Sequence, residues 1–373
     1  MRVKVAVAPE MGRKVFIEEV NLAEPGLNEV RIKVMACTIC HSDIHAIAGE
    51  HGEYEGSAAV GHEVAGIIDA IGEGVTYVKP GDRVLCSLMS QGCGYCDRCL
   101  AGHSMWFCRN LNLNRDTRIS PLSRDNGDLI RQPYGFAGYA TYTNAADNRI
   151  VKLDDDIPFE VAAILACGFV SGGAAVFNRC QLIPGQSFAV TGCGGVGMSA
   201  VMAAHVSGAA PLIAIDPNPI KREKALKFGA AHVIDPTAVD VVQAVLDITD
   251  GFGVNHSLVA VAEKTVKRST FSFTAGDGQM VVVGHGHPKD EDLSEFSIME
   301  FLRGKRIIGS ILGNINLRRD IPKYMDMYRL GLLDIEAMID ARYDLDNIQQ
   351  ALDDSENPDM GLLKVVVVCN DYN

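Results

Sequence analysis

Residues 186–311 alternate between short apolar runs and segments with helical periodicity, and this alternation restricts the fold more than any other feature of the chain. The apolar runs include QSFAVTG, PLIAID and HSLVAV, and the helical segments include GVGMSAVMAAHVSG, NPIKREKALKFG and VDVVQAVLDITDG. Strands that alternate with helices in this way form a parallel sheet with helices on both of its faces. The sequence therefore predicts an α/β fold with a doubly wound parallel sheet over these residues.

A glycine-rich run, TGCGGVG, lies between the first strand and the first helix of this region. Its glycines permit a tight turn and let the main chain approach a pyrophosphate, while the N-terminus of the following helix offers N–H groups. The alternative is a packing turn without a ligand, but the position between a strand and a helix favours a dinucleotide site. The residues expected to bind the cofactor are Gly192, Gly194, Gly195, Val196 and Gly197.

A carboxylate ends the second strand of the same region. Asp216 follows PLIAI, where it can accept hydrogen bonds from both ribose hydroxyls of an adenosine. The same carboxylate repels a 2′-phosphate, so the sequence favours NAD over NADP. Lys221 lies just beyond Asp216, and we expect it to contact the cofactor as well.

The first 150 residues have a different texture, with short β segments such as VKVAVA, EVRIKVMA, EVAGIIDAIG and DRVLCS between turns rich in Gly and Pro. This pattern predicts antiparallel strands with long loops that carry functional residues. Residues 109–133 are polar and rich in turn formers, so we expect a long surface loop there. Beyond residue 312 the pattern returns to mixed helix and short strand. A chain of 373 residues is long enough for two domains.

The run CGYCDRCLAGHSMWFC holds four of the chain's eleven cysteines, Cys93, Cys96, Cys99 and Cys108. Four thiolates close the tetrahedral shell of a zinc ion, so such a site stabilises a fold and admits no substrate. The alternative is four reduced thiols without a metal. Because the N-terminus lacks the apolar block of a signal peptide, we expect reduced cysteines and a cytoplasmic protein.

A second set of donors is scattered along the chain. ACTICHSDIH contains Cys40, GHE contains His62, and LACGF contains Cys167. Each of these residues alone is more often a core or turn residue than a ligand. As a set they make two thiolates and one imidazole, which leave the fourth position of a zinc ion open, as in catalytic sites.

The stretches CHSDIH, GHEVAGIIDAIGEGV, KPGDRV, CGYCDRCLAG, ACGFVSGGAAVFN and TGCGGVGMSA occur together and in order. In this the chain resembles the zinc-dependent medium-chain alcohol dehydrogenase family along essentially its whole length. The resemblance implies a GroES-like catalytic domain at 1–168, a Rossmann-type NAD-binding domain at 169–311 and a C-terminal segment, 312–373, that returns to the catalytic domain. The gap between Cys99 and Cys108 is one residue longer than the family usually has.

The resemblance also implies a role for each matching residue. Cys40, His62 and Cys167 would bind a catalytic zinc ion, Glu63 and Asp43 would support these ligands, and the four clustered cysteines would bind a structural zinc ion. Ser42 would begin a proton relay that passes the nicotinamide ribose and reaches solvent at His45. The remaining cofactor contacts would be His41 at the pyrophosphate, Ser171, Val283 and His285 at the nicotinamide, and Lys364 at a phosphate.

These residues together predict an enzyme that transfers a hydride reversibly between a primary or secondary alcohol and NAD, with two zinc ions per subunit. Two alternatives remain, a nicotinoprotein that keeps NAD(H) bound and uses another electron acceptor, and an inactive nucleotide-binding relative. A net charge of −13 without a basic run argues against a nucleic-acid partner. The sequence has no apolar run of about 18 residues, so we expect no segment that spans a membrane. Family members are dimers or tetramers, so we expect a homodimer or homotetramer.

Overall fold

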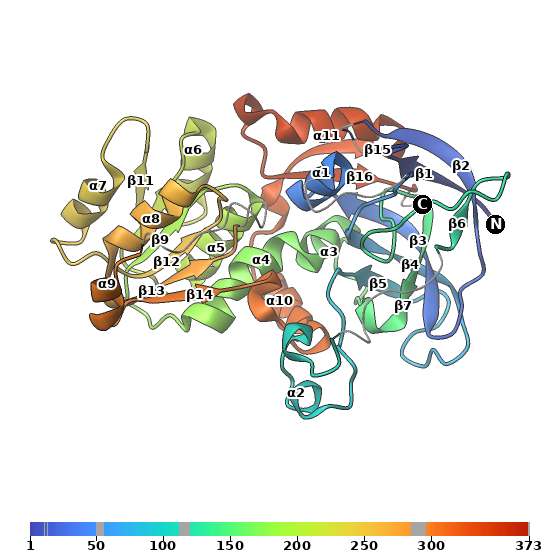
Figure 1. Ribbon diagram of the computed structural model, residues 1–373, viewed down its shortest axis with the longest axis horizontal. Coiled ribbons are helices and arrows are strands. Elements are labelled where there is room, and N and C mark those ends of the chain that lie inside the picture. Colours follow the sequence, from blue (N-terminus) through green and yellow to red (C-terminus); the bar gives the residue numbers. More distant parts are fainter. Residues whose placement is uncertain (11, 13, 50–55, 112–119, 285–295, 372–373) are drawn as a thin grey trace.

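The computed structural model describes the chain except for residues 11, 13, 50–55, 112–119, 285–295 and 372–373. Figure 1 shows a β-rich half that contains both termini and an α/β half at the other end of the long axis. The strands of the β-rich half are β1 (Arg2–Val7), β2 (Phe16–Leu22), β3 (Glu29–Thr38), β4 (Glu63–Ile71), β5 (Arg83–Cys86), β6 (Leu122–Ser123), β7 (Tyr142–Ala146), β8 (Ile150–Lys152), β15 (Ile339–Asp344) and β16 (Lys364–Val368).

The α/β half contains a six-stranded sheet in the order β11-β10-β9-β12-β13-β14, and all its strand pairs are parallel. Its strands are β9 (Phe188–Thr191), β10 (Leu212–Ile215), β11 (His232–Ile234), β12 (Val254–Val259), β13 (Thr274–Val282) and β14 (Arg306–Gly309). The helices of the chain are α1 (His41–Ala48), α2 (Asp97–Leu100), α3 (Phe159–Ala166), α4 (Gly168–Ala175), α5 (Gly195–Val206), α6 (Pro219–Lys227), α7 (Val241–Ile248), α8 (Lys264–Phe273), α9 (Ile298–Leu302), α10 (Leu317–Arg329) and α11 (Ile348–Glu356).

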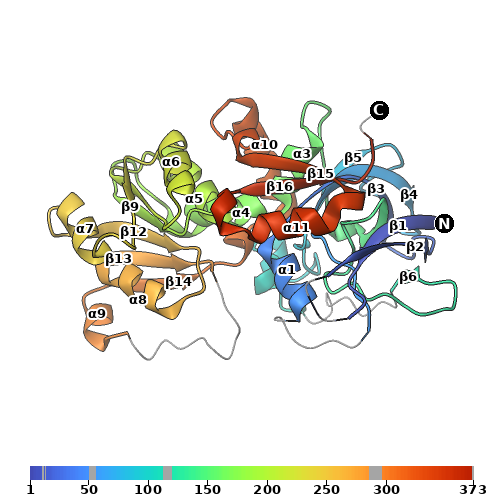
Figure 2. The same cartoon turned by 90° about the horizontal axis from the view of Figure 1, so that it is seen from above.

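Successive strands are added to this sheet on one side of β9 and then on the other. Helices α5 and α6 lead from β9 toward one edge of the sheet, whereas α7 and α8 lead back through β12 toward the other edge. Because crossovers between parallel strands are right-handed, the two pairs of helices cover opposite faces, as Figure 2 shows. The predicted doubly wound sheet is confirmed, and its strand order changes direction between β9 and β12, where such sheets bind ligands.

The β-rich half consists of a three-stranded sheet, β1-β2-β6, and a seven-stranded sheet, in which β7 also pairs with β3. All its strand pairs are antiparallel except β15–β16. The predicted mainly β architecture is therefore confirmed. Strand β16 pairs with β3 so that Val367 lies opposite Cys37, which returns the C-terminal segment to the β-rich half. The boundaries proposed at 168/169 and 311/312 stay predictions.

The expected surface loop at 109–133 is only partly correct. Its residues 112–119 lie outside the described part of the chain. Leu122 and Ile130 are buried, and β6 pairs with β2, so the second portion of this segment belongs to the β-rich core. The few apolar residues of this polar segment show too little periodicity to predict a strand.

Helix α4 directly follows α3 and packs closely against α5. A Cβ atom at Gly172 would lie 1.8 Å from the main-chain oxygen of Val196, so only glycine permits this approach. The largest buried apolar cluster runs through α3, α4 and α5 and includes Leu85 of the β-rich half and Val190 of the α/β half. This packing sets the position of the glycine-rich turn relative to the ends of β3 and β4.

Among the described residues, no single helix is long and apolar enough to cross a bilayer. The segments Phe159–Ala166 and Gly168–Cys180 meet the criterion of length and apolar composition only when they are taken together, and they are bent by 59°. Most residues of α3 and α4 are buried inside the protein.

Candidate active site

The three scattered donors come from points where regular structure begins or ends. Cys40 follows β3 and is the N-cap residue of α1, and His62 immediately precedes β4. Cys167 separates α3 from α4, and its φ of −150° and ψ of −59° break the helical run. Because the three donors lie outside regular helices and strands, their side chains can point toward one another.

His62 is held in one orientation by Asp43. The Nδ1 of His62 lies 2.9 Å from Oδ1 of Asp43, and the carboxylate accepts hydrogen bonds only, so Nδ1 donates. Asp43 also accepts the N–H of Gly61 at 3.0 Å and the hydroxyl of Tyr139 at 2.9 Å. The opposite ring nitrogen of His62, Nε2, is buried and has no partner in the structure. An unpartnered buried acceptor is what a metal ligand presents.

The donor atoms of Cys40, His62, Glu63 and Cys167 all lie within 4.8 Å of one another. Ligands of a tetrahedral zinc ion lie about 3.3–3.8 Å apart, because metal–ligand bonds are about 2.0–2.3 Å long. A hydrogen bond from Cys167 lowers the pKa of the Cys40 thiol well below its ordinary value, although burial opposes the shift. Two thiols and a free imidazole nitrogen in this arrangement fit a zinc ion.

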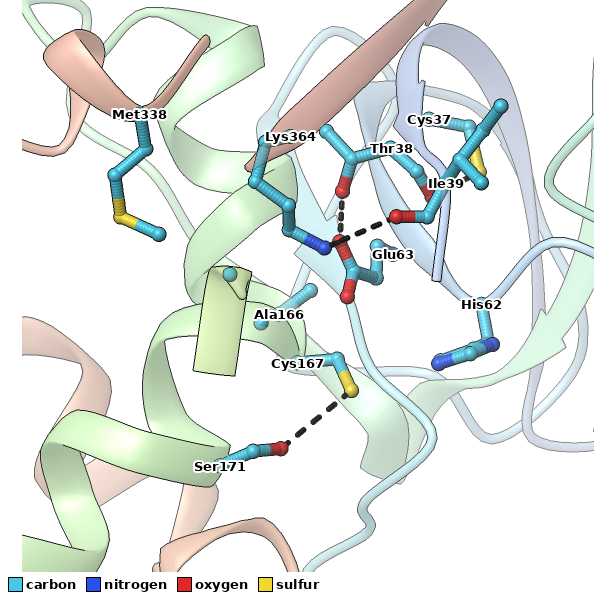
Figure 3. A network of polar contacts seen from close by, with 12 residues as sticks. Cys37, Thr38, Ile39, His62, Glu63, Ala166, Cys167, Ser171, Met338 and Lys364 are labelled. Carbon is cyan, nitrogen blue, oxygen red and sulfur yellow. Dashed lines mark hydrogen bonds and ion pairs between the residues drawn. The ribbon is translucent and has the colours of Figure 1, made fainter. Parts of the chain in front are cut away.

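Glu63 lies beside this cluster with its carboxylate turned to a lysine (Figure 3). Its Oε2 lies 2.5 Å from Nζ of Lys364 and accepts a hydrogen bond from the hydroxyl of Thr38, while Oε1 has no partner among the described residues. Burial raises the pKa of Glu63 to about 7, although the Lys364 ammonium opposes this shift. Lys364 is itself buried and also donates to the main-chain oxygen of Ile39 at 3.2 Å.

A cleft of about 430 Å³ extends from Cys40 along the carboxyl edge of the parallel sheet. It is lined by Cys40, His41, Ser42 and His45 from the start of α1, by the glycine-rich turn, and by Asp216, Lys221, Val283 and Lys364. Ser42 and His45 are three positions apart on α1 and so lie on one face of the helix. The structure thus brings most of the predicted catalytic and cofactor-binding residues to one cleft.

The glycines of the turn meet three different requirements. Gly192 has φ of +88°, which side chains rarely tolerate. A Cβ atom at Gly197 would lie 1.7 Å from the oxygen of Gly192, so this glycine allows α5 to pack on the turn. Gly194, the N-cap residue of α5, faces open space, and a Cβ there would meet no atom within 4 Å. This open cradle at the N-terminus of a helix fits a pyrophosphate.

Asp216 is buried at the end of β10 and is fixed by main-chain N–H groups. Its Oδ2 accepts from Cys193 at 2.7 Å and its Oδ1 accepts from Asn218 at 2.8 Å. Each carboxylate oxygen has a second lone pair, and Asp216 lines the cleft. The carboxylate can therefore accept ribose hydroxyls and still hold the glycine-rich turn in place.

Three predicted cofactor contacts remain less direct. Ser171 does not line the cleft; its hydroxyl lies 3.8 Å from the sulfur of Cys167. His285 lies outside the described residues. Lys364 lines the cleft, but its ammonium engages Glu63, so a role at the cofactor phosphate stays a prediction.

Other residues of the cleft had no recognisable motif. Those that follow β12 are Ala260, Val261, Ala262 and Glu263, and those from the C-terminal segment are Ser355, Leu362 and Leu363. Since β12 adjoins β9, its carboxyl end lies at the same edge as the glycine-rich turn. The strand order alone would have identified the first group.

The four clustered cysteines form a separate lobe around α2 and a 3₁₀ turn at Met105–Phe107. The sulfur atoms of Cys93, Cys96, Cys99 and Cys108 all lie within 4.8 Å of one another, so the longer gap before Cys108 does not exclude it from the cluster. Hydrogen bonds from Asn110 and main-chain N–H groups lower the pKa of Cys93 to about 6, against the effect of desolvation. This four-thiol arrangement fits a closed zinc site.

A glycine-rich turn on a doubly wound sheet, next to two thiols and an imidazole that fit a zinc ion, is typical of a metal-dependent dehydrogenase. The comparisons with known proteins agree. Residues 26–155 match the family model of the alcohol dehydrogenase GroES-like domain, and residues 195–329 match that of the zinc-binding dehydrogenases.

The similarity to individual proteins extends over nearly the whole chain. Alcohol dehydrogenase 1 of Trifolium repens is 32% identical and covers 95% of this chain and 94% of its own. Probable S-(hydroxymethyl)glutathione dehydrogenase 1 of Schizosaccharomyces pombe is 33% identical and covers 94% of this chain and 93% of its own. Benzyl alcohol dehydrogenase of Acinetobacter calcoaceticus has a TM-score of 0.89 at 29% identity and covers 99% of this chain and 100% of its own. This chain belongs to the zinc-dependent medium-chain alcohol dehydrogenase family.

Proposed function

We propose that the protein is a zinc-dependent alcohol dehydrogenase that transfers a hydride reversibly between a primary or secondary alcohol and NAD. The observation that carries this proposal is that Cys40, one of the four clustered donors, lines the same cleft as Ser42 and the glycine-rich turn. Hydride transfer needs reacting carbons about 3–3.5 Å apart. An alcohol beside Cys40 and a nicotinamide in the cleft would be neighbours.

Cys40, His62 and Cys167 would hold a zinc ion, which would supply the Lewis acid that makes an alcohol acidic, and NAD would accept the hydride. Asp43 keeps Nε2 of His62 free to act as a ligand. Ser42 accepts the proton of the alcohol and positions its oxygen. His45, on the same face of α1 as Ser42, passes that proton to solvent.

The second zinc ion of each subunit belongs to the four-cysteine lobe, where it stabilises the chain without contacting substrate. The cofactor is NAD, because the carboxylate of Asp216 at the ribose end of the cleft disfavours a 2′-phosphate. His41 and Lys221 line the same cleft and supply positive charge or N–H groups to the pyrophosphate and ribose.

A spectrophotometric screen tests this function. Zinc-loaded protein is incubated with NAD and aliphatic, aromatic and terpenoid alcohols, and we expect NADH formation with at least one of these classes. Cys40→Ala should abolish turnover while NADH binding, measured by fluorescence, is retained. Absence of turnover with every alcohol, in protein that holds two zinc equivalents, would contradict the proposal. Purified protein that already carries one equivalent of non-exchanging NAD(H) would instead identify a nicotinoprotein.

A further inference from the structure

Arg222, on α6, gives an indication about the cofactor that conflicts with that of Asp216. In doubly wound dinucleotide folds, a carboxylate near the end of the second strand favours NAD, whereas an arginine nearby accommodates the 2′-phosphate of NADP. This chain has both, since Arg222 lies six positions after Asp216. The contacts of Arg222 show which of the two side chains is available to a cofactor.

The guanidinium of Arg222 is occupied by acceptors of the protein itself. Its Nη1 donates to the main-chain oxygens of Asp216 at 2.8 Å and Pro217 at 2.7 Å, and its Nη2 lies 2.9 Å from Oδ2 of Asp235. Only 17% of the Arg222 side chain and 29% of the Asp235 side chain are exposed. Asp216 and Lys221 line the cleft, whereas Arg222 is not among the described residues of its wall. The arginine thus supports the main chain at the ribose site instead of facing the cofactor.

Asp235 is itself held in place by Thr237. Its Oδ1 accepts from the N–H of Thr237 at 2.9 Å and from the hydroxyl of the same residue at 2.6 Å. These hydrogen bonds lower the pKa of Asp235, and the Arg222 charge lowers it further, so the carboxylate is ionised at neutral pH. Because Thr237 occupies Oδ1, Oδ2 is the oxygen that pairs with Arg222.

Asp216 and Asp235 occupy equivalent positions on neighbouring strands. Ile215 of β10 pairs in register with Ile234 of β11, and each is followed directly by one of the two aspartates. The N–H of Asp216 donates to the oxygen of Ile234 at 3.2 Å. Arg222 therefore joins two adjacent strand ends beside the ribose end of the cleft. A 2′-phosphate there would be a charged acceptor, which binds a guanidinium more strongly than neutral main-chain oxygens do.

We propose that Asp235 is a second determinant of the preference for NAD, because it holds Arg222 away from the 2′-phosphate of NADP. This inference rests on the proposed function and its choice of cofactor. Asp216 repels the phosphate, and Asp235 occupies the cation that would otherwise bind it. Asp235 is a positioning residue, since it acts through Arg222 and is not among the described residues that line the cleft.

Asp235→Asn tests this role with a small change in shape. Thr237 still donates to Oδ1, so the amide NH2 takes the place of Oδ2 and offers Arg222 no acceptor. Added to Asp216→Asn, this substitution should raise the ratio of kcat/KM for NADP to that for NAD about 5-fold or more above that of Asp216→Asn alone, through a lower KM for NADP. Asp235→Ala also removes Oδ2 and repeats the test if the Asn variant does not fold.

A third substitution identifies the group that binds the phosphate. Arg222→Gln, added to the double variant, should return the ratio to that of Asp216→Asn. Glu223→Gln in the Asp216→Asn background is the matched control, because Glu223 neighbours Arg222 on α6 but pairs with Lys227 at 2.8 Å. Its ratio should equal that of Asp216→Asn. The dissociation constants of NADPH and NADH, measured by fluorescence, should follow the same order in all variants.

The inference is overturned if the double variant has the ratio of Asp216→Asn. It is also overturned if the gain persists without Arg222, since the gain then reflects only the loss of a negative charge near the phosphate. The binding measurements need no turnover, so they test Asp235 even if the protein oxidises none of the alcohols. An unmodified protein that binds NADPH as tightly as NADH would contradict the proposed choice of NAD, and the inference would fail with it.

Discussion

Cys167 illustrates how backbone geometry turns an ordinary residue into a ligand. It ends α3 and precedes α4, and the break at this residue points its thiol at Cys40 instead of into the helix packing. The adjacent Gly168 has no Cβ, and one there would lie 2.4 Å from Cε of Lys364. The ligand, the break and the buried lysine therefore depend on one another.

Asp43→Asn should weaken zinc binding about 10- to 100-fold, because Asp43 orients His62 and its charge makes the ring a more basic ligand. A competition titration with a chelator, with metal analysis of the product, measures the change. Asp346→Asn is the control, since Asp346 is an exposed carboxylate that pairs with Lys4 at 3.1 Å. Equal zinc affinity in the two variants would contradict the role of Asp43.

Asp216→Asn should shift the cofactor preference toward NADP. The amide oxygen can still accept one main-chain N–H, so the glycine-rich turn keeps a contact, but the charge that repels a 2′-phosphate is gone. We expect the ratio of kcat/KM for NADP to that for NAD to rise about 10-fold or more. Asp247→Asn, on the exposed side of α7, should leave this ratio unaltered. An unchanged ratio in the Asp216 variant would argue against charge as the selector.

The sequence indicated Cys40, His62 and Cys167 because each lies in a short stretch with a recognisable pattern. The family resemblance also indicated Asp43 and Glu63 beside them, but not the further partners of these two carboxylates. Lys364 reaches Glu63 over 301 positions because β16 pairs with β3, and β3 pairs with β4. Contacts that arise from strand register have no local signature, so Tyr139 and the Lys364–Glu63 pair became visible only in the structure.

At the scale of elements, the four-cysteine lobe is attached to the body by the partly buried Met105 and Trp106, which pack against the largest apolar cluster, and by polar contacts. Arg319 of α10 donates to the oxygen of Gly102 at 2.8 Å, and the N–H of Ser90 lies 3.1 Å from the sulfur of Met105. Helix α2 buries none of its residues, so it has no apolar face to hold it. A zinc ion is the interaction best placed to stabilise this lobe.

Cys96→Ser should therefore remove one zinc equivalent per chain and lower the melting temperature, while the cleft keeps its zinc. Metal analysis and thermal denaturation measure the two effects. Cys40→Ala is the complement, because it should remove the other equivalent and leave the lobe intact, and the double variant should hold none. Loss of both ions in Cys96→Ser alone would show that the two sites are not independent.

The turn that precedes β16 is hydrogen-bonded to α6, on the other side of the cleft. Asn218 donates to the oxygen of Pro358 at 2.6 Å, and Lys224 donates to that of Gly361 at 3.1 Å. Lys224 also pairs with Asp340 at 2.5 Å. Because Leu362 and Leu363 line the cleft directly after this turn, the fastening holds one wall of the cofactor site.

Lys224→Ala should consequently speed NADH release about 3- to 10-fold, since it removes two contacts that hold this wall. Stopped-flow displacement of NADH measures the rate. Lys227→Ala is the matched control, because Lys227 lies on the same helix and pairs only within it, with Glu223 at 2.8 Å. Identical release rates in the two variants would exclude the turn as a determinant of cofactor exchange.

Elements with strong periodicity could be predicted, and those without it could not. Helix α8 lies in a stretch for which no helix was expected, because its sequence, KTVKRSTFSF, is rich in Ser and Thr and poor in apolar residues. It forms because two of its own side chains, Phe271 and Phe273, are buried in the protein, so tertiary packing overrides weak helix propensity. The same reasoning explains β6, whose two residues are specified by pairing with β2.

At the scale of the whole molecule, the cleft exists because the chain crosses between its halves more than once. The α/β half follows the first portion of the β-rich half, and β16 then returns to pair with β3. The sequence predicted both folds from local patterns, but not the apolar cluster that contains residues of both halves, nor the close contact of α4 with α5 at Gly172. In the sequence, the only sign of such a close contact is a glycine.

The free edge of the parallel sheet leads us to propose a homodimer. Strand β14 is last in the sheet order, so one of its sides presents main-chain groups without a strand partner among the described residues. The adjoining segment exposes several large apolar side chains, namely Ile298 (68% exposed), Met299 (53%), Leu302 (71%) and Ile311 (51%). An open edge next to an apolar surface favours pairing with a second copy about a two-fold axis.

Sedimentation velocity should accordingly give twice the mass of one chain, or a multiple of it. Leu302→Glu places a charge in the proposed apolar contact and should shift the protein toward the monomer, with a concentration-dependent transition. Leu100→Glu, on the exposed four-cysteine lobe, is the control for a charge introduced at a similarly exposed leucine (74%) and should remain a dimer. A dimer that survives Leu302→Glu at low concentration would place the interface away from β14 and α9.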